Sequence, residues 1–295
     1  MHRNRPFALV IILLAFIHSG CKKFEKAPIP AYIYVKKPFN LNTASNNSQG
    51  EGSEKIVDVW VDVDGISIGS YGLPCQIPIL KTGKVKLSLK AGIINSGQDE
   101  QRIIYPFYTT DTLTLDLKEE HVDTLVGNVN YVQGLKFPFI EDFSFVSDKL
   151  IIAGKKLQDS ILVLNDKDSW KENNNYGKIQ FSDSTTIFME LRMNTPDVKG
   201  FDMPAIGSRV YFEFDYRSNV DFFVGMIITS NGGVGKYPIL NVNAKSTWNK
   251  IYLDLSNEFI KLSADNKFKI YLSIPKSTEV PTDFNIDNLK LIYFD

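Results

Sequence analysis

The sequence has 295 residues, of which 43% are hydrophobic, and its 33 basic and 34 acidic residues leave a formal net charge of −1. A chain of this length can bury the cores of two domains. The lysines and arginines are scattered and form no basic arm or face, which excludes the usual footprint of a nucleic-acid-binding protein, so we expect no nucleic-acid partner.

The first twenty residues have the features of an export signal. Basic residues open the chain, an apolar run covers residues 6–17, and His18-Ser19-Gly20 leads to Cys21. The run is too short for a good membrane span, and the small residues after it are typical of a cleavage site. The segment resembles the signal peptide and lipobox of bacterial lipoproteins.

This resemblance implies removal of residues 1–20 and attachment of diacylglycerol and a further acyl chain, such as palmitate, to Cys21. We therefore expect a protein held on the bacterial outer membrane by a lipid anchor, with the leaflet left open. Residues 21–30 are short, charged and proline-bearing, which favours a lipidated tether.

Residues 31–133 show the pattern of a small β-sandwich. Residues 31–35 predict a first strand, and residues 40–54, rich in Asn, Ser and Gly, predict a flexible loop. Valines alternate with polar residues over residues 57–63, and Asp64-Gly65 predicts a tight turn to a returning strand at residues 66–69. The same alternation recurs at residues 84–90 and 112–117. Short alternating strands between turns are typical of a sandwich.

Part of this region resembles a known module. The run Val61-Asp62-Val63-Asp64-Gly65, followed by Gly69, Pro74, Leu80, Gly83 and Ala91-Gly92-Ile93, is similar to the PEGA-type, immunoglobulin-like module of extracytoplasmic bacterial proteins. The resemblance implies a spacer or a binding platform rather than a catalyst.

Residues 128–136 are the candidate boundary, and residues 137–295 predict a second β domain. Its expected strands cover residues 139–145, 186–193, 210–217, 222–229, 248–255, 267–274 and 285–294. No stretch keeps a helical period, and residues 257–262 predict at most a short turn. The fold class is therefore all-β, with an N-terminal Ig-like or PEGA-like sandwich followed by a second sandwich.

The second domain also carries a resemblance. Glu141-Asp142-Phe143 near its start, Trp248 to Leu255, and Phe284 to Leu291 are similar to the jelly-roll sandwich of carbohydrate-binding modules and galactose-binding-like domains. The whole chain resembles two-domain surface lipoproteins of Bacteroidetes-type bacteria, a group without an assigned activity.

The jelly-roll resemblance implies a structural calcium ion held by Glu141, Asp142 and Asp287, and hard oxygen ligands suit calcium. The alternative is that Asp287 is simply an acid at the end of a strand. We expect no other cofactor.

Catalytic residues are scarce. After removal of the signal, His121 is the one imidazole, and Cys75 has no cysteine partner, so triads and zinc sites lack their components. We expect His121 to be solvated and Cys75 to be a small buried residue. The carboxylates of Asp58, Asp62, Glu213 and Asp215 are interpreted as the wet faces of strands, and the protein as not an enzyme.

Aromatic rings beside amides remain as the candidate ligand site. Trp170, Tyr176 and Tyr237 lie in or beside polar loops that contain Asn173 and Asn231. Loops on a rigid sandwich commonly carry binding residues. The alternative is that these rings plug the ends of the sandwich.

The sequence thus predicts a non-catalytic envelope protein that binds a glycan or a protein partner through its jelly roll. Two other hypotheses are a glycan-active hydrolase with paired carboxylates and a structural subunit of a surface assembly.

Overall fold

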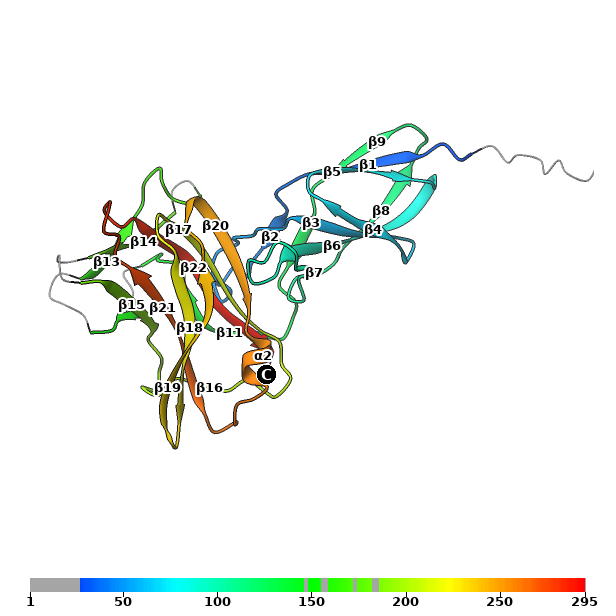
Figure 1. Ribbon diagram of the computed structural model, residues 1–295. Coiled ribbons are helices and arrows are strands. Elements are labelled where there is room, and N and C mark those ends of the chain that lie inside the picture. Colours follow the sequence, from blue (N-terminus) through cyan, green and yellow to red (C-terminus); the bar gives the residue numbers. More distant parts are fainter. Residues whose placement is uncertain (1–26, 146–147, 155–158, 172–173, 182–185, 295) are drawn as a thin grey trace, which may run out of the picture.

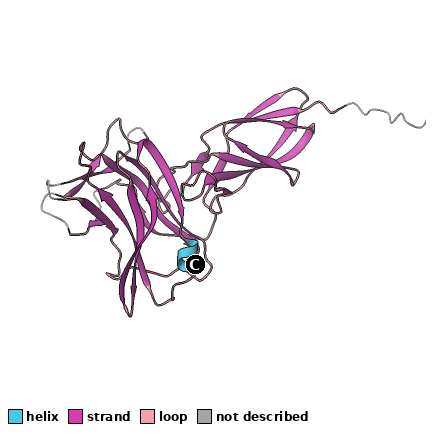
Figure 2. Ribbon diagram, viewed as in Figure 1, coloured by secondary structure: helices cyan, strands magenta, loops and turns pink. Residues whose placement is uncertain are grey.

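The computed structural model describes residues 27–145, 148–154, 159–171, 174–181 and 186–294, so the signal segment and Cys21 lie outside the described residues. The chain is all-β (Figures 1 and 2). The helix described is the short α2 (Ser256–Phe259). In the described part of the chain, no helix has the length and apolar character needed to cross a membrane.

The N-terminal module, strands β1 to β10, is a sandwich. One sheet has the order β4-β3-β6-β7 with β8 also paired to β6, the facing sheet has the order β5-β1-β9, and β10 pairs with β2. The strands are β1 (Ala31–Val35), β2 (Asn40–Asn42), β3 (Asp58–Val63), β4 (Ile66–Gly72), β5 (Cys75–Ile79), β6 (Gly83–Ile94), β7 (Arg102–Ile104), β8 (Asp111–Leu117), β9 (Val122–Leu125) and β10 (Asn128–Asn130).

Alternation along the strands builds this core. Val59, Val61 and Val63 of β3 are buried with the facing leucines of β6, because alternate residues of a strand share one face. Asp64 and Gly65 both have positive φ, at 50° and 82°, and join β3 to β4 as a tight turn. The predicted hairpin is confirmed.

The C-terminal module, strands β11 to β22, is a jelly-roll sandwich of two sheets. The first, which we call the interface sheet, has the order β13-β14-β22-β17-β20 with β11 paired to β22. The second, the distal sheet, has the order β12-β15-β21-β18-β19 with β16 paired to β21. The strands are β11 (Leu135–Glu141), β12 (Leu150–Ile152), β13 (Ser160–Leu164), β14 (Tyr176–Gln180), β15 (Phe188–Met193), β16 (Phe201–Asp202), β17 (Val210–Ser218), β18 (Phe222–Ser230), β19 (Gly233–Val242), β20 (Lys245–Asp254), β21 (Lys267–Pro275) and β22 (Phe284–Phe294).

Rings and aliphatic side chains from both sheets fill this second core. Phe212 and Phe214 of β17 pack with residues such as Met226 of β18 and Leu272 of β21. The residues of β17 that alternate with these face the N-terminal module, since Glu213 contacts Tyr105 and Tyr131 and Tyr211 belongs to the N-terminal apolar cluster.

The two modules share a buried interface. Tyr211, Tyr252 and Ile292 of the interface sheet belong to the same apolar cluster as the N-terminal core. Tyr105 packs edge-on against Tyr211, with ring centroids 5.1 Å apart, and lies 4.8 Å from Tyr252. Aromatic contacts of this kind add to the burial of apolar surface.

Residues 43–57, which we call the crossing segment, run over the outward face of the interface sheet. Lys55 contacts Asn249 of β20, Ser53 contacts Asp215 of β17, and Asn47 contacts Asp142 beyond β11. The predicted loop is therefore a packed strap, preceded by the short β2.

Two further points differ from the sequence analysis. The polar loop expected around Asn231 is a tight turn, because β18 ends at Ser230 and β19 begins at Gly233. The strands β12, β13 and β14 were not predicted, because their short sequences lack a long alternation.

Candidate functional site

The outward face of the interface sheet carries buried charges. Glu213 is fully buried and accepts hydrogen bonds from the hydroxyls of Tyr105, at 2.5 Å, and Tyr131, at 3.0 Å. Lys250 Nζ lies 3.1 Å from Glu213 Oε2, as an ion pair rather than an aligned hydrogen bond. Burial lowers the pKa of Lys250, but Asp215 and Glu213 outweigh it and hold that pKa above its usual value.

A second group of acids lies under the crossing segment. Asp215 accepts hydrogen bonds from Ser53 and from Asn288 Nδ2, the latter at 2.8 Å. Asp287 accepts hydrogen bonds from Asn174 Nδ2 and from the backbone N–H of Asn288, both at 2.8 Å. Burial, and then the charge of Asp215, raises the pKa of Asp287 well above its ordinary value.

These positions correct the interpretation of the strand acids as solvated. Glu213 and Asp215 are covered by the N-terminal module and the crossing segment, and Asp58 is buried beside Arg102, 2.7 Å from its guanidinium. Asp62 is half-buried and paired with Lys90. Alternation along a strand predicts which face is polar, but it does not show that a second module covers that face.

Further along β17 and β20, the same face of the interface sheet carries Arg217 and Trp248, which are both half-buried. Here the Arg217 guanidinium lies 5.9 Å from the centre of the Trp248 ring, and Tyr176 meets that ring edge-on at 5.6 Å. The Trp248 indole donates a hydrogen bond to the carbonyl of Asp168 in the β13–β14 loop, which also contains Trp170. Asn285 of β22 is the cross-strand neighbour of Arg217.

We call Trp170, Tyr176, Arg217, Trp248 and Asn285 the Trp–Arg cluster. Three of its buried polar atoms have no hydrogen-bond partner among the described residues: Trp170 Nε1, Arg217 Nε and Asn285 Oδ1. A buried polar atom without a partner costs about 1–3 kcal/mol. The cluster therefore contains two donors and one acceptor that the described residues leave unpaired.

The structure places the predicted ligand residues in two separate regions. Trp170 is half-buried in the β13–β14 loop. Tyr176 follows the alternative of a ring packed into the end of the sandwich: it is 1% exposed and meets Trp248 edge-on, and its hydroxyl donates to Asp166 at 3.3 Å. Tyr237 is exposed on β19, and Asn231 is exposed in the β18–β19 turn.

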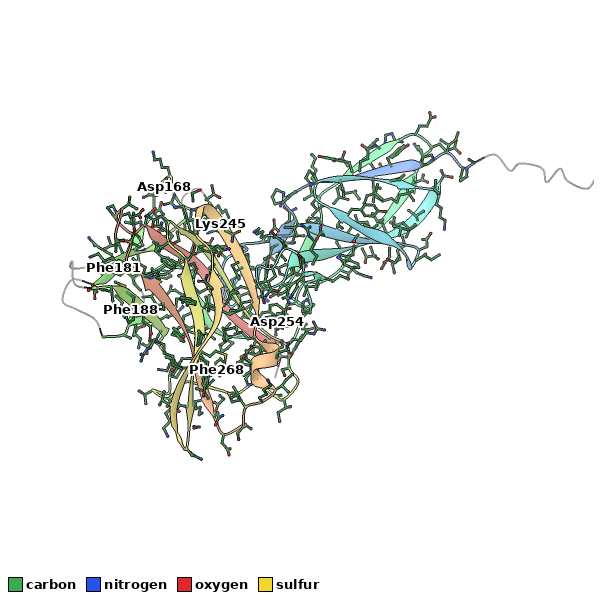
Figure 3. All side chains as sticks on the ribbon, in the orientation of Figure 1. Asp168, Phe181, Phe188, Lys245, Asp254 and Phe268 are labelled. Atoms are coloured by element: carbon green, nitrogen blue, oxygen red, sulfur yellow. The ribbon has the colours of Figure 1, made fainter. Side chains whose placement is uncertain are left out.

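That turn lies at the opposite end of the module from Asp168 (Figures 1 and 3). The structure therefore does not bring Tyr237 and Asn231 to Trp170. Asn173 lies outside the described residues.

Arg217, Trp248 and Asn285 were missed as site residues. Arg217 follows Glu213 and Asp215 on the polar side of the predicted strand, and Trp248 opens another predicted strand. Alternation alone could have placed them on one face, but not beside the β13–β14 loop.

The predicted calcium ligands accept hydrogen bonds from backbone amides. Glu141 Oε1 accepts the Phe143 amide at 2.9 Å, and Asp142 Oδ1 accepts the Ser144 amide at 3.1 Å. Within the described residues, no three or more His, Cys, Asp or Glu side chains form a group that could hold a metal ion. Asp287 interacts electrostatically with Asp142, so the acids are near one another.

The remaining candidate residues lie away from this face. His121 is solvated, with its side chain 60% exposed, as predicted. Cys75 is a half-buried free thiol on β5, and burial raises its pKa.

No family model matches the chain, and no curated protein matches it. Solved structures do resemble it. A family 11 carbohydrate-binding module of a Clostridium thermocellum cellulosomal cellulase is 19% identical, covers 52% of this chain and 93% of its own, and has a TM-score of 0.37.

Two other solved structures have similarly low sequence identities and TM-scores. A xylan-binding domain of family 22 is 12% identical, with 52% and 93% coverage and a TM-score of 0.36. A structure described for carbohydrate-binding modules of the β-sandwich superfamily is 14% identical, with 90% and 99% coverage and a TM-score of 0.40.

Proposed function

We propose that this protein is a lipid-anchored, non-catalytic component of the bacterial outer membrane that binds a glycan through the Trp–Arg cluster. The observation that carries the proposal is the half-buried Trp248 ring with the Arg217 guanidinium 5.9 Å from its centre, beside the half-buried Trp170 of the β13–β14 loop.

Sugars match this chemistry on two counts. A pyranose has an apolar face that can lie on an indole, and its hydroxyls both donate and accept hydrogen bonds. The sugar ring would lie on the Trp248 indole, and its hydroxyls would accept from the exposed part of the Arg217 guanidinium.

The binding test compares Trp248→Ala with the wild type on an array of plant and microbial polysaccharides. Stacking on a protein ring is worth about 1–3 kcal/mol for nucleic-acid bases, so loss of the Trp248 ring should weaken binding about tenfold or more. Phe188→Ala, which removes a ring 51% exposed on the distal sheet, is the matched control and should bind normally. Equal binding by the wild type and a folded Trp248→Ala protein would place the ligand elsewhere.

The anchor is supported by the signal and lipobox pattern ending at Cys21. Two or more acyl chains hold a protein on a membrane almost permanently, since each buried methylene contributes about 0.8 kcal/mol. Cys21→Ala should abolish incorporation of a clickable palmitate analogue in cells. Unchanged labelling of that variant would show that Cys21 carries no lipid.

A further inference from the structure

A cavity of about 330 Å³ lies at the edge of the interface sheet, where the N-terminal module meets β20. Its walls come from both modules. The β6–β7 turn contributes Ser96 to Asp99, and the C-terminal module contributes residues 240–243 and 249–252. The volume is at the lower end of the range for small-molecule sites, which suits one sugar ring or two.

Positive charge dominates the walls. Lys55, Lys245 and Lys250 line the cavity, and Asp99 is the one acid among the described residues that line it. Lys250 is already balanced by the buried Glu213 behind it. Lys55 donates a hydrogen bond to the neutral amide of Asn249, so its charge is not balanced by that contact.

The two outer lysines repel each other. Burial lowers the pKa of Lys55, the charges of Lys245 and Lys37 lower it further, and Asp99 opposes the shift. An anion between Lys55 and Lys245 would relieve this repulsion.

The rest of the lining suits hydroxyl groups. Gln98, Asn241, Asn243 and Asn249 provide side-chain amides. The oxygens of Gln98 and Asn249 already accept from Gln101 and Lys55, so these two amides would act toward a ligand mainly as donors. The Tyr216 ring lies beside them, and its hydroxyl donates to the Asn243 carbonyl at 2.7 Å, which holds this wall in place.

We propose that this pocket between the modules binds a carboxylate-bearing sugar of the hexuronate class. Its carboxylate would lie between Lys55 and Lys245, and its hydroxyls would face the amides. This is a different site from the Trp–Arg cluster, so it stands independently of the function proposed above.

The test measures binding of D-glucuronate and D-galacturonate to the purified full chain in detergent, by saturation-transfer NMR titration, with D-glucose and D-galactose for comparison. We expect saturable binding of a uronate and binding of the matching neutral sugar about tenfold weaker or more, because the carboxylate contacts are lost. Lys55→Gln and Lys245→Gln should each weaken uronate binding about threefold to fivefold.

Lys261→Gln, at an exposed position beyond α2, is the control and should bind like the wild type. Melting temperatures establish that each variant is folded, and Lys245, being exposed, can be changed without disturbing the core. Trp248→Ala should retain uronate binding, which separates this site from the Trp–Arg cluster.

Three outcomes would overturn the proposal: no saturable uronate binding, equal affinity for the neutral sugars, or unchanged affinity in both lysine variants. Inorganic sulfate that competes as well as the uronate would reduce the site to an anion site and overturn the sugar assignment. Loss of uronate binding in folded Trp248→Ala would overturn the claim of a separate site.

Discussion

Asp287 is a carboxyl group whose protonation is coupled to folding. It is fully buried, and burial followed by the charge of Asp215 raises its pKa well above the ordinary value of about 3.9. Between the unfolded and folded pKa values, the folded protein binds more protons than the unfolded chain. The free energy of unfolding therefore falls as pH rises through this window, and the contribution is recovered on acidification.

Asp287→Asn should remove this part of the pH dependence, because the amide cannot ionise and still offers Oδ1 to the Asn288 amide. Urea unfolding between pH 4 and pH 8 measures it, and the variant should lose less stability than the wild type as pH rises. Asp265→Asn, at an exposed site, is the control. Identical slopes for the wild type and Asp287→Asn would contradict the prediction.

Residue-scale prediction from sequence was partial for the candidate site. Trp170 stays a predicted ligand residue, half-buried in the β13–β14 loop. The sequence left the exposure of Tyr176 open, because its burial depends on Trp248, which is 72 positions away along the chain. Contacts between distant strands follow from topology, and one sequence does not specify topology.

Among the elements, the crossing segment is not a strand, yet it holds the N-terminal module to the interface sheet through its side-chain contacts. At Gly50 φ is +64°, and an added Cβ would lie 2.8 Å from Ile140 Cγ2 and 3.2 Å from Lys290 Cε. Gly65 also has a positive φ, +82°, but its added Cβ would meet nothing within 4 Å. The two glycines share the backbone requirement and differ in packing.

Gly65→Ala should therefore cost only about 1–2 kcal/mol, the penalty for a left-handed residue with a side chain. Gly50→Ala should cost more by about 1–3 kcal/mol, since the crossing segment must also shift off the interface sheet. Guanidinium unfolding of both variants measures the difference. Equal losses would mean that the segment is not tightly packed on the sheet.

Strands were easier to predict than this segment. β1, β3, β17 and β22 have clear alternation or long apolar runs, and the structure contains them. The crossing segment is rich in Asn, Ser and Gly, and its order comes from contacts such as Ser53 with Asp215. A composition rich in Asn, Ser and Gly predicts a loop, but it does not tell whether that loop is free in solvent or packed on a sheet.

For the whole molecule, the interface predicts coupled unfolding of the modules. Separation of the two modules would expose Tyr211 and Tyr252. It would also remove the hydrogen bonds that Tyr105 and Tyr131 donate to Glu213. Calorimetry of the full chain should show one transition, with calorimetric and van't Hoff enthalpies in agreement.

Glu213→Ala should lower the stability of that single transition by about 3–5 kcal/mol, because the buried Lys250 would lose its ion-pair partner and the hydroxyls of Tyr105 and Tyr131 would lose their acceptor. Glu258→Ala, at an exposed position in α2, is the control. Two separate transitions in the wild type would show that the modules fold independently, as their predicted boundary at residues 128–136 would allow.

The place of β1 has a mechanical consequence. This strand begins at the end of the N-terminal module farthest from the jelly roll (Figure 1), and it pairs with β5 on one side and β9 on the other. If the chain is tethered through its amino terminus and its jelly roll holds a ligand, tension pulls β1 along its own axis. The backbone hydrogen bonds to both neighbours are then loaded in shear and must break together, whereas an edge strand peeled from one end would lose them in succession. The arrangement would let the protein hold its ligand against flow.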